Sequence, residues 1–162
     1  MLFFPDSARG QIAYPKAEVF GGVSIASLDL EVSRESFWGW EASVAGNFHK
    51  NVGLVADFGG QYKSIAGTRV QLYEYLFGPK LSLRGKKFTA FHHSLFGGAH
   101  ISGGGESDNA FMIGTGVGID LDASDRLAFR LVQFDFIPHR SGGEWSTRDF
   151  RVAFGIVLKA RR

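Results

Sequence analysis

The chain has 162 residues, 22 glycines, 16 phenylalanines and no cysteine, and its formal net charge is +2. This length suits one domain, the lack of cysteine excludes disulfides and thiolate metal sites, and a small net charge without a basic stripe gives no support to nucleic-acid binding. No stretch approaches the roughly 18 apolar residues that a membrane helix needs.

Turn residues divide the chain into eight segments in which side chains alternate with the period of two that is typical of β-strands. Each segment is close to the roughly 9–11 residues that a tilted membrane strand needs. In chain order, the predicted strands are Ala17 to Ala26, Phe37 to Phe48, Val52 to Tyr62, Val70 to Arg84, Phe88 to Ile101, Phe111 to Leu121, Leu127 to Ile137 and Asp149 to Lys159.

The sixth segment is the most informative, because one of its faces is large and apolar while the other is small. Phe111, Ile113, Val117 and Ile119 share the first face, whereas the second is mostly glycine and ends in Asp120. Glycine weakens a strand unless space on its face is short. The pattern therefore predicts a narrow lumen and an apolar outer surface, as in a membrane β-barrel.

The polar faces of the strands carry charges of both signs in similar number. An eight-stranded barrel is only just wide enough for its side chains to fill it, and charges buried there must be paired. We therefore predict an ion-pair network that plugs the lumen, with a narrow gated pore as the alternative. The network is predicted to contain Glu18, Glu41, Asp57, Glu74, Lys80, Arg84, Asp120, Arg130 and Arg151, with Lys159 on the same face.

Three segments need separate treatment. Pro79 removes a ladder donor from the fourth segment, which predicts an irregularity there. In the seventh, Arg130 lies on one face while Gln133 and Asp135 lie on the other, which predicts a bulge that resets the phase. In the fifth, the alternation predicts an outer face of Phe91, Leu95, Ala99 and Ile101 and a lumen face of His92, Ser94, Phe96, Gly98 and His100.

The connections alternate between short turns and longer polar loops, which is the asymmetry of outer-membrane barrels. An even strand count then puts both termini on the short-turn, periplasmic side. The short turns are His49–Asn51, Gly85–Lys87 and Asp122–Asp125, and the longer loops are Ser27–Ser36, Lys63–Arg69, Ser102–Asn109 and His139–Arg148. Amphipathic rings near the long-loop ends predict an interfacial girdle, formed by Trp38, Trp40, Tyr62, Tyr73 and Tyr75, with Phe48 and Phe88 near the opposite border.

Several short motifs resemble the small outer-membrane β-barrel family, which includes the outer membrane protein A-type membrane domain. They are K-A-E-V-F-G-G (Lys16 to Gly22), A-S-V-A-G-N (Ala42 to Asn47), G-L-V-A-D-F-G-G-Q-Y (Gly53 to Tyr62), Y-L-F-G-P-K-L-S (Tyr75 to Ser82), L-F-G-G-A-H (Leu95 to His100) and G-V-G-I-D-L (Gly116 to Leu121). The resemblance implies the barrel fold and assembly by the barrel-assembly machinery. The chain ends on Arg162, whereas family members usually end on an aromatic residue.

Met1 to Lys16 does not have the pattern of a signal peptide, because Leu2 to Phe4 is too short for an apolar h-region and Pro5 follows at once. We expect residues 1–16 to form an N-terminal extension and residues 17–160 to form the barrel domain.

Other candidate chemistry is weaker. His92 and Ser94 could form the base and hydroxyl of a lipid hydrolase, but the predicted facing puts both in the lumen, away from lipid. A metal site of His92 and His100 would have to bridge about 26 Å of strand at roughly 3.3 Å per residue. The run G-T-G-V-G lacks the spacing and the helix of a dinucleotide site. The carboxylates of Glu106 and Asp108 could bind calcium, but an exposed flexible loop also accounts for two acidic residues at these positions. Trp145 precedes the last predicted strand and fits either a contact with a partner or the interfacial girdle.

We therefore predict an all-β protein, an eight-stranded antiparallel up-and-down transmembrane β-barrel of the bacterial outer membrane. Its expected role is structural or interactive, within a larger envelope assembly, without catalysis, cofactor or metal. The expected partners are the lipid bilayer, lipopolysaccharide, the barrel-assembly machinery and proteins that contact the loops, and no nucleic acid. The alternatives are a soluble lipocalin-like barrel that binds an apolar ligand, and a lipid-modifying outer-membrane enzyme.

Overall fold

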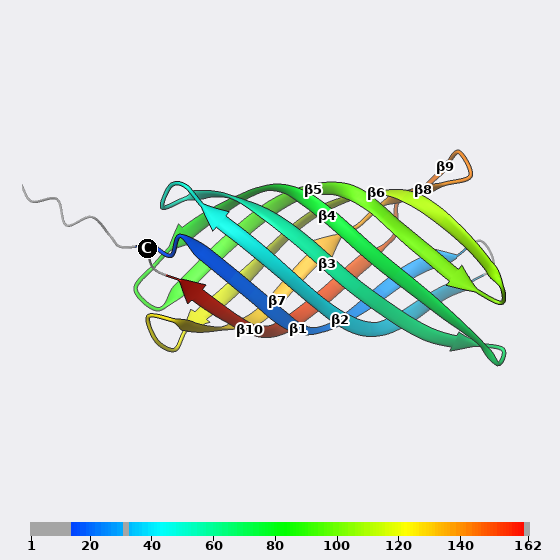
Figure 1. Ribbon diagram of the computed structural model, residues 1–162, viewed down its shortest axis with the longest axis horizontal. Helices are drawn as coiled ribbons and strands as arrows, with labels where there is room; N and C mark the ends of the chain where they lie inside the picture. Colours follow the sequence, from blue (N-terminus) through cyan, green and yellow to red (C-terminus); the bar gives the residue numbers. More distant parts are fainter. Residues whose placement is uncertain (1–13, 31–32, 161–162) are drawn as a thin grey trace, which may run out of the picture.

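The alternating segments of the sequence form long antiparallel strands that pair with their neighbours and close on themselves (Figure 1). The computed structural model describes residues 14–30 and 33–160, so residues 1–13 of the predicted N-terminal extension lie outside the described part. The eight barrel strands are β1 (Ala17–Leu30), β2 (Ser33–Asn47), β3 (Val52–Ile65), β4 (Thr68–Arg84), β5 (Phe88–Gly103), β6 (Glu106–Asp122), β7 (Leu127–Phe136) and β10 (Phe150–Ala160).

Each strand pairs with the next in sequence, and β1 pairs with β10 to close the barrel. A small hairpin of β8 (His139–Ser141) and β9 (Glu144–Ser146) extends from one end through a short pairing of β8 with β6. This arrangement confirms the predicted eight-stranded antiparallel barrel. No helix in the described ranges is long and apolar enough to cross a membrane.

Three of the predicted longer loops are instead largely strand. In Ser27–Ser36, β1 and β2 pair as far as Leu30 and Ser33, and in Lys63–Arg69 and Ser102–Asn109 the strands continue to a tight turn. β3 and β4 are joined by Ala66 and Gly67, and β5 and β6 by Gly104 and Gly105. All four residues have a positive φ, between 50° and 82°, which is the backbone of a two-residue type I′ hairpin and matches the twist of the flanking strands. The predicted loops are wrong in this respect, because polar alternating residues beyond the bilayer still find partners across the ladder.

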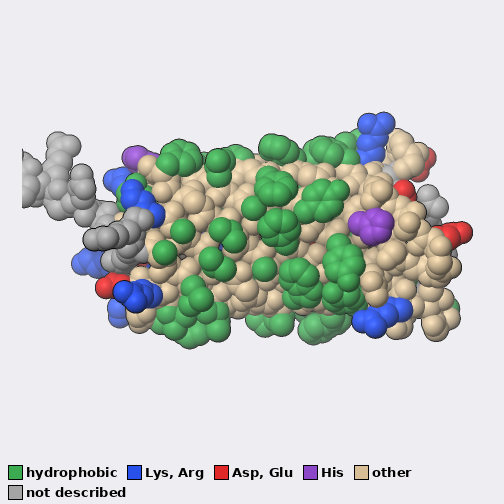
Figure 2. All heavy atoms as spheres, viewed as in Figure 1, with side chains coloured by type: hydrophobic (Ala, Val, Ile, Leu, Met, Phe, Trp, Pro, Cys, Tyr) green, Lys and Arg blue, Asp and Glu red, His purple; other side chains and the backbone are tan. Residues whose placement is uncertain are grey.

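Large apolar side chains cover the outside of the barrel. Leu54, Val117 and Leu158, for example, are more than half exposed although they lie in the middle or near the end of long strands. Figure 2 shows such side chains spread along the wall, with Lys and Arg gathered at the two ends. A lipocalin-like barrel would hide its apolar lining inside, so the observed facing contradicts that alternative.

The predicted facing of β5 is wrong. Phe91, Leu95 and Ala99 are buried inside the barrel, whereas His92 and Ser94 are exposed on its outer surface. The reason lies on β6: the ring of Phe91 occupies the space where Gly118 lacks a Cβ, and Leu95 lies opposite Gly114. The glycine face of β6 thus accepts the large side chains of β5, and this contact decides which face of β5 turns inward.

The predicted bulge in β7 is present. Leu131 and Val132 are both exposed, and the register shifts between the pairs Ile119↔Val132 and Asp120↔Arg130. The extra residue turns Arg130, Gln133 and Asp135 all inward. The ladder between β4 and β5 is interrupted around Pro79, between the pairs Phe77↔Phe96 and Lys80↔His93, as a residue without an N–H requires.

Gly116 tests the packing of the glycine face. A Cβ there would collide with Asp135 Oδ1 and lie 2.8 Å from the carbonyl oxygen of Phe134. We expect Gly116→Ala to lower the free energy of unfolding by about 1–3 kcal/mol, measured by urea titration in lipid vesicles. Gly21→Ala is the matched control, because a Cβ at Gly21 meets no atom within 4 Å. Equal stability of the two variants would contradict this account.

Candidate functional site: the interior ion-pair network

The interior of the barrel holds a network of charged and polar side chains. Arg84 is partly buried and the other predicted network residues are buried. The structure places in the interior Glu18, Glu41, Asp57, Glu74, Lys80, Arg84, Asp120, Arg130, Arg151 and Lys159.

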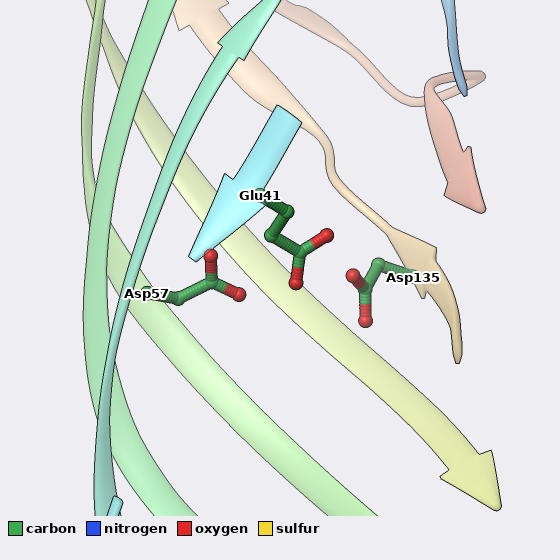
Figure 3. A group of neighbouring side chains, drawn as sticks. All are labelled: Glu41, Asp57 and Asp135. Carbon is green, nitrogen blue, oxygen red and sulfur yellow. The ribbon is translucent and has the colours of Figure 1, made fainter. Parts of the chain in front are cut away.

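Arg151 of β10 is the centre of this network, and its side chain is fully buried. Its Nη1 donates to Glu74 Oε2 at 2.6 Å, and its Nη2 donates to Asp57 Oδ2 at 2.9 Å and to Asp135 Oδ2 at 2.8 Å. Its Nε lies 3.3 Å from Glu41 Oε2. One guanidinium therefore joins carboxylates from four other strands. Figure 3 shows three of these carboxyl groups turned toward one another from β2, β3 and β7.

Three further members of the centre were not in the predicted network: His93, Gln133 and Asp135. Gln133 Nε2 donates to Glu41 Oε1 and to Asp135 Oδ2, both at 2.7 Å. His93 Nε2 lies 2.7 Å from Asp135 Oδ1. The bulge signal in β7 indicated a change of phase that would bring Gln133 and Asp135 to the face of Arg130. His93 could have been found only with the correct phase of β5.

Arg130 links the centre to the short-turn half of the lumen. Its Nε and Nη2 donate to the two oxygens of Asp120 at 2.8 and 3.1 Å, and its Nη1 donates to Gln133 Oε1 at 2.7 Å. The guanidinium also lies over the rings of Phe20 and Phe91, at 4.2 and 4.3 Å from their centroids. A bidentate ion pair between two aromatic faces satisfies this buried cation.

A second cluster lies near the short-turn end. Glu18 accepts from Lys80 Nζ at 2.8 Å and from Arg84 Nη1 at 3.2 Å, and Asn47 Nδ2 donates to it at 3.3 Å. Lys159 pairs separately with Asp122 at 2.6 Å. The cations of the lumen thus have carboxylate partners from other strands.

A layer of apolar side chains lies on the long-loop side of the network. On β2, Phe37 lies closer to that end than Glu41, and on β4, Leu72 lies closer to it than Glu74. These two side chains belong to one buried apolar cluster with Ala26, Ala45, Val55, Leu76, Leu95, Ala99, Met112 and Ile137. Ala45, Val55 and Leu76 lie on the short-turn side of the carboxylates of their own strands, so the cluster also continues past the centre. The charged centre is therefore covered by hydrocarbon toward the long-loop mouth.

Glu41, Asp57 and Asp135 are the group in the described part of the chain whose oxygens lie close enough, within 4.8 Å, to hold a metal ion. All three contact Arg151, which already supplies a cation to them. The geometry is that of a structural ion-pair centre rather than of a metal site. His92 and His100 belong to no such group among the described residues.

No known family model and no curated protein matches the chain by sequence. Solved structures match it closely in shape. Neisserial surface protein A superimposes with a TM-score of 0.75 at 10% identity, over 89% of this chain and 97% of that chain. The outer membrane protein OprG from Pseudomonas aeruginosa superimposes with a TM-score of 0.64 at 8% identity, over 93% of this chain and 98% of that chain. Ail of Yersinia pestis superimposes with a TM-score of 0.59 at 10% identity, over 89% of this chain and 97% of that chain.

The fold is that of the small outer-membrane β-barrels. The apolar outer surface is the facing that a barrel embedded in a bacterial outer membrane needs. The structural likeness extends over nearly the whole described barrel. The sequence identities of 10% and 8% are too low for individual residues of these proteins to be equated with residues of this chain.

The predicted girdle residues lie on the outside of this membrane barrel, toward the long-loop end of β2, β3 and β4. Trp40 Nε1 donates to the hydroxyl of Tyr62 at 3.1 Å, and the rings of Tyr62 and Tyr73 meet edge to face with centroids 6.0 Å apart. Trp38 and Tyr75 are exposed beside them. Trp145 packs edge to face on Phe111 at 6.1 Å, so it continues the aromatic surface around β6.

The candidates for other chemistry are placed differently from expectation. His92 and Ser94 face outward, and His92 Nε2 lies 3.1 Å from Thr115 Oγ1. Glu106 and Asp108 belong to a strand of the β5–β6 hairpin instead of a flexible loop.

Arg151→Met tests the role of the centre. Removing the guanidinium leaves buried carboxylates without their shared cation, so we expect a loss of about 3–5 kcal/mol in the free energy of unfolding, measured by urea titration in vesicles. Lys159→Met is the control, because its partner Asp122 is 26% exposed and water can replace the lost contact. If the free energy of unfolding fell equally little in both variants, the barrel would not depend on the Arg151 guanidinium.

Proposed function

We propose that this protein is a closed outer-membrane barrel that acts through its outer surface and its long-loop hairpins. It has a structural or interaction role, as a subunit of a larger envelope assembly, and it performs no catalysis. The observation that carries this proposal is the number of buried side chains that share the interior, namely the Arg151 centre and the apolar cluster that contains Phe37 and Leu72. The interior of an eight-stranded barrel is only just wide enough for its side chains to fill, which supports a closed lumen.

The two interior layers oppose permeation in different ways. An ion that entered from the long-loop side would first have to leave water for the layer that contains Phe37, Leu72 and Met112. It would then have to displace a guanidinium held by four carboxylates at 2.6–3.3 Å. Both steps are costly in a low-dielectric interior, which favours a plugged lumen over the gated-pore alternative.

The long-loop end offers the surface for partners. The hairpins at Ala66–Gly67 and Gly104–Gly105 continue the barrel strands beyond the girdle and end in tight turns. Paired strands present side chains in a fixed geometry, which reduces the entropy lost when a protein partner binds. Insertion of such a barrel is assigned to the barrel-assembly machinery on the ground of its fold.

Lipopolysaccharide fits the outer rim. Tyr62, Lys63, Ser64 and Arg69 line a recess of about 350 Å³ directly beside the aromatic girdle, and the Arg69 guanidinium lies 5.6 Å from the centroid of the Tyr62 ring. Cationic groups at the level of the headgroups attract anionic lipid. We assign this recess to a phosphate of lipopolysaccharide.

The closed lumen predicts that vesicles containing the folded protein release small sugars and ions no faster than empty vesicles. A general porin, whose wider barrel leaves an aqueous channel, serves as the positive control in the same efflux assay. A heat-shifted gel band shows that the protein in the vesicles is folded. Efflux above the empty vesicles with folded protein would overturn the plugged-lumen proposal.

The lipid recess predicts that Arg69→Ala weakens the thermal stabilisation of the barrel by lipopolysaccharide by about 1 kcal/mol, the contribution of one cation at a charged membrane surface. Melting is compared in vesicles with and without lipopolysaccharide. Arg126→Ala is the matched control, because Arg126 is exposed at the short-turn end, where no lipopolysaccharide lies. Equal effects of the two variants would remove the recess from the proposal.

A further inference from the structure

A polar patch interrupts the apolar outer surface of β5 and β6. It consists of His92, Ser94 and Thr115, which all face outward. Ser94 lies opposite Thr115 in the register, and the imidazole of His92 bonds to the Thr115 hydroxyl at 3.1 Å. The patch is bordered by exposed apolar side chains on three strands, which are Phe77 and Leu81 of β4, Phe96 of β5, and Ile113 and Val117 of β6.

The patch lies deep in the bilayer. Phe88 begins β5 as an exposed ring beside the short turn, and Ser94 follows six residues later. Six residues rise about 20 Å along a strand, or about 15 Å along the axis of a barrel whose strands tilt by roughly 40°. Because the apolar band of such a barrel is about 25 Å tall, Ser94 and Thr115 lie near its middle, out of reach of either headgroup layer.

Polar groups at this depth need partners. Hydroxyl and imidazole groups that face hydrocarbon lose the hydrogen bonds they would make to water, and polar side chains inside a membrane generally face protein. Pro79, which has no N–H to donate, lies where the β4–β5 ladder is interrupted, next to the patch. The patch is thus a poor surface to expose to lipid chains.

We propose that the patch is the interface with a second copy of this chain. Serine, threonine and histidine each donate and accept hydrogen bonds, so two identical patches related by a two-fold axis complement each other without any charge. The side chains of Ser94 and Thr115 are small, which lets two barrel walls approach closely, as small residues do in membrane-embedded interfaces. The inference rests on the proposed membrane-spanning role.

A lipid hydrolase would use the same residues differently. His92 would act as the base for a hydroxyl nucleophile, and the lipid ester would have to reach that hydroxyl. Ester groups lie at the border of the hydrocarbon core, whereas the patch lies near its middle. The depth therefore favours a protein partner over a lipid substrate.

Site-specific disulfide formation tests the dimer, because the chain contains no cysteine that could compete. Ser94→Cys is reconstituted in vesicles at a large excess of lipid and oxidised. Val23→Cys is the matched control: Val23 is exposed on β1, six residues from the start of that strand, and β1 lies across the barrel from β5. We expect about tenfold more cross-linked dimer from Ser94→Cys, which corresponds to ~1.4 kcal/mol.

A second set of variants separates hydrogen bonding from mere proximity. Adding His92→Leu and Thr115→Val to Ser94→Cys removes the self-complementary groups, and we expect the cross-linking to fall to the level of Val23→Cys. Fluorescence energy transfer between labelled Ser94→Cys chains measures the same association without oxidation. A heat-shifted band and flotation with vesicles report membrane insertion separately, so failure of the membrane role is distinguished from failure of the dimer.

Three outcomes would overturn the dimer. Inserted Ser94→Cys could cross-link no more than Val23→Cys, or it could cross-link in cells only to a different protein. Release of fatty acid from membrane lipid by the native chain, lost in His92→Leu, would assign the patch to lipid hydrolysis instead.

Discussion

The contact between Arg151 and the carboxylates around it is the interaction on which the rest of the barrel depends. Four strands other than β10 send Glu41, Asp57, Glu74 and Asp135 to this one guanidinium. Each carboxylate would be expensive to bury alone, and the cation would be equally expensive without them. Because each side needs the other, this contact holds together strands that are distant in sequence.

The glycines on the inner face of β6 are the second constraint on the barrel, because they leave room for side chains of the neighbouring strands. Gly116 and Gly118 leave space that Asp135 and Phe91 occupy from neighbouring strands, and Leu95 packs beside Gly114. Asp135 reaches Arg151 and His93 from this space. The small face of β6 is therefore part of the same arrangement as the ion-pair centre, because the carboxylate could not reach its partners past a larger side chain.

The outer surface shows three different chemistries at three depths. Exposed leucine, valine and phenylalanine side chains suit lipid chains, the Trp40–Tyr62–Tyr73 cluster suits the border with the headgroups, and Arg69 lies just beyond that cluster. The patch of His92, Ser94 and Thr115 breaks this order, since it is polar at a depth where the rest of the described wall is apolar. A break of this kind indicates contact with protein rather than with lipid.

The sequence by itself determined the eight strands, the apolar outside and the inward position of ten charged residues, because a period of two separates the two faces of a strand without reference to any neighbour. Only the tertiary structure decided which face of β5 turns inward, because both faces of that strand carry polar and apolar residues. The glycines of β6 accept Phe91 and Leu95, so the face that carries these two residues lies inside. It also decided that polar residues beyond the girdle pair as strands, and that His93 and Asp135 join Arg151. These features depend on which residues oppose one another across the ladder, and that register is a property of the closed barrel.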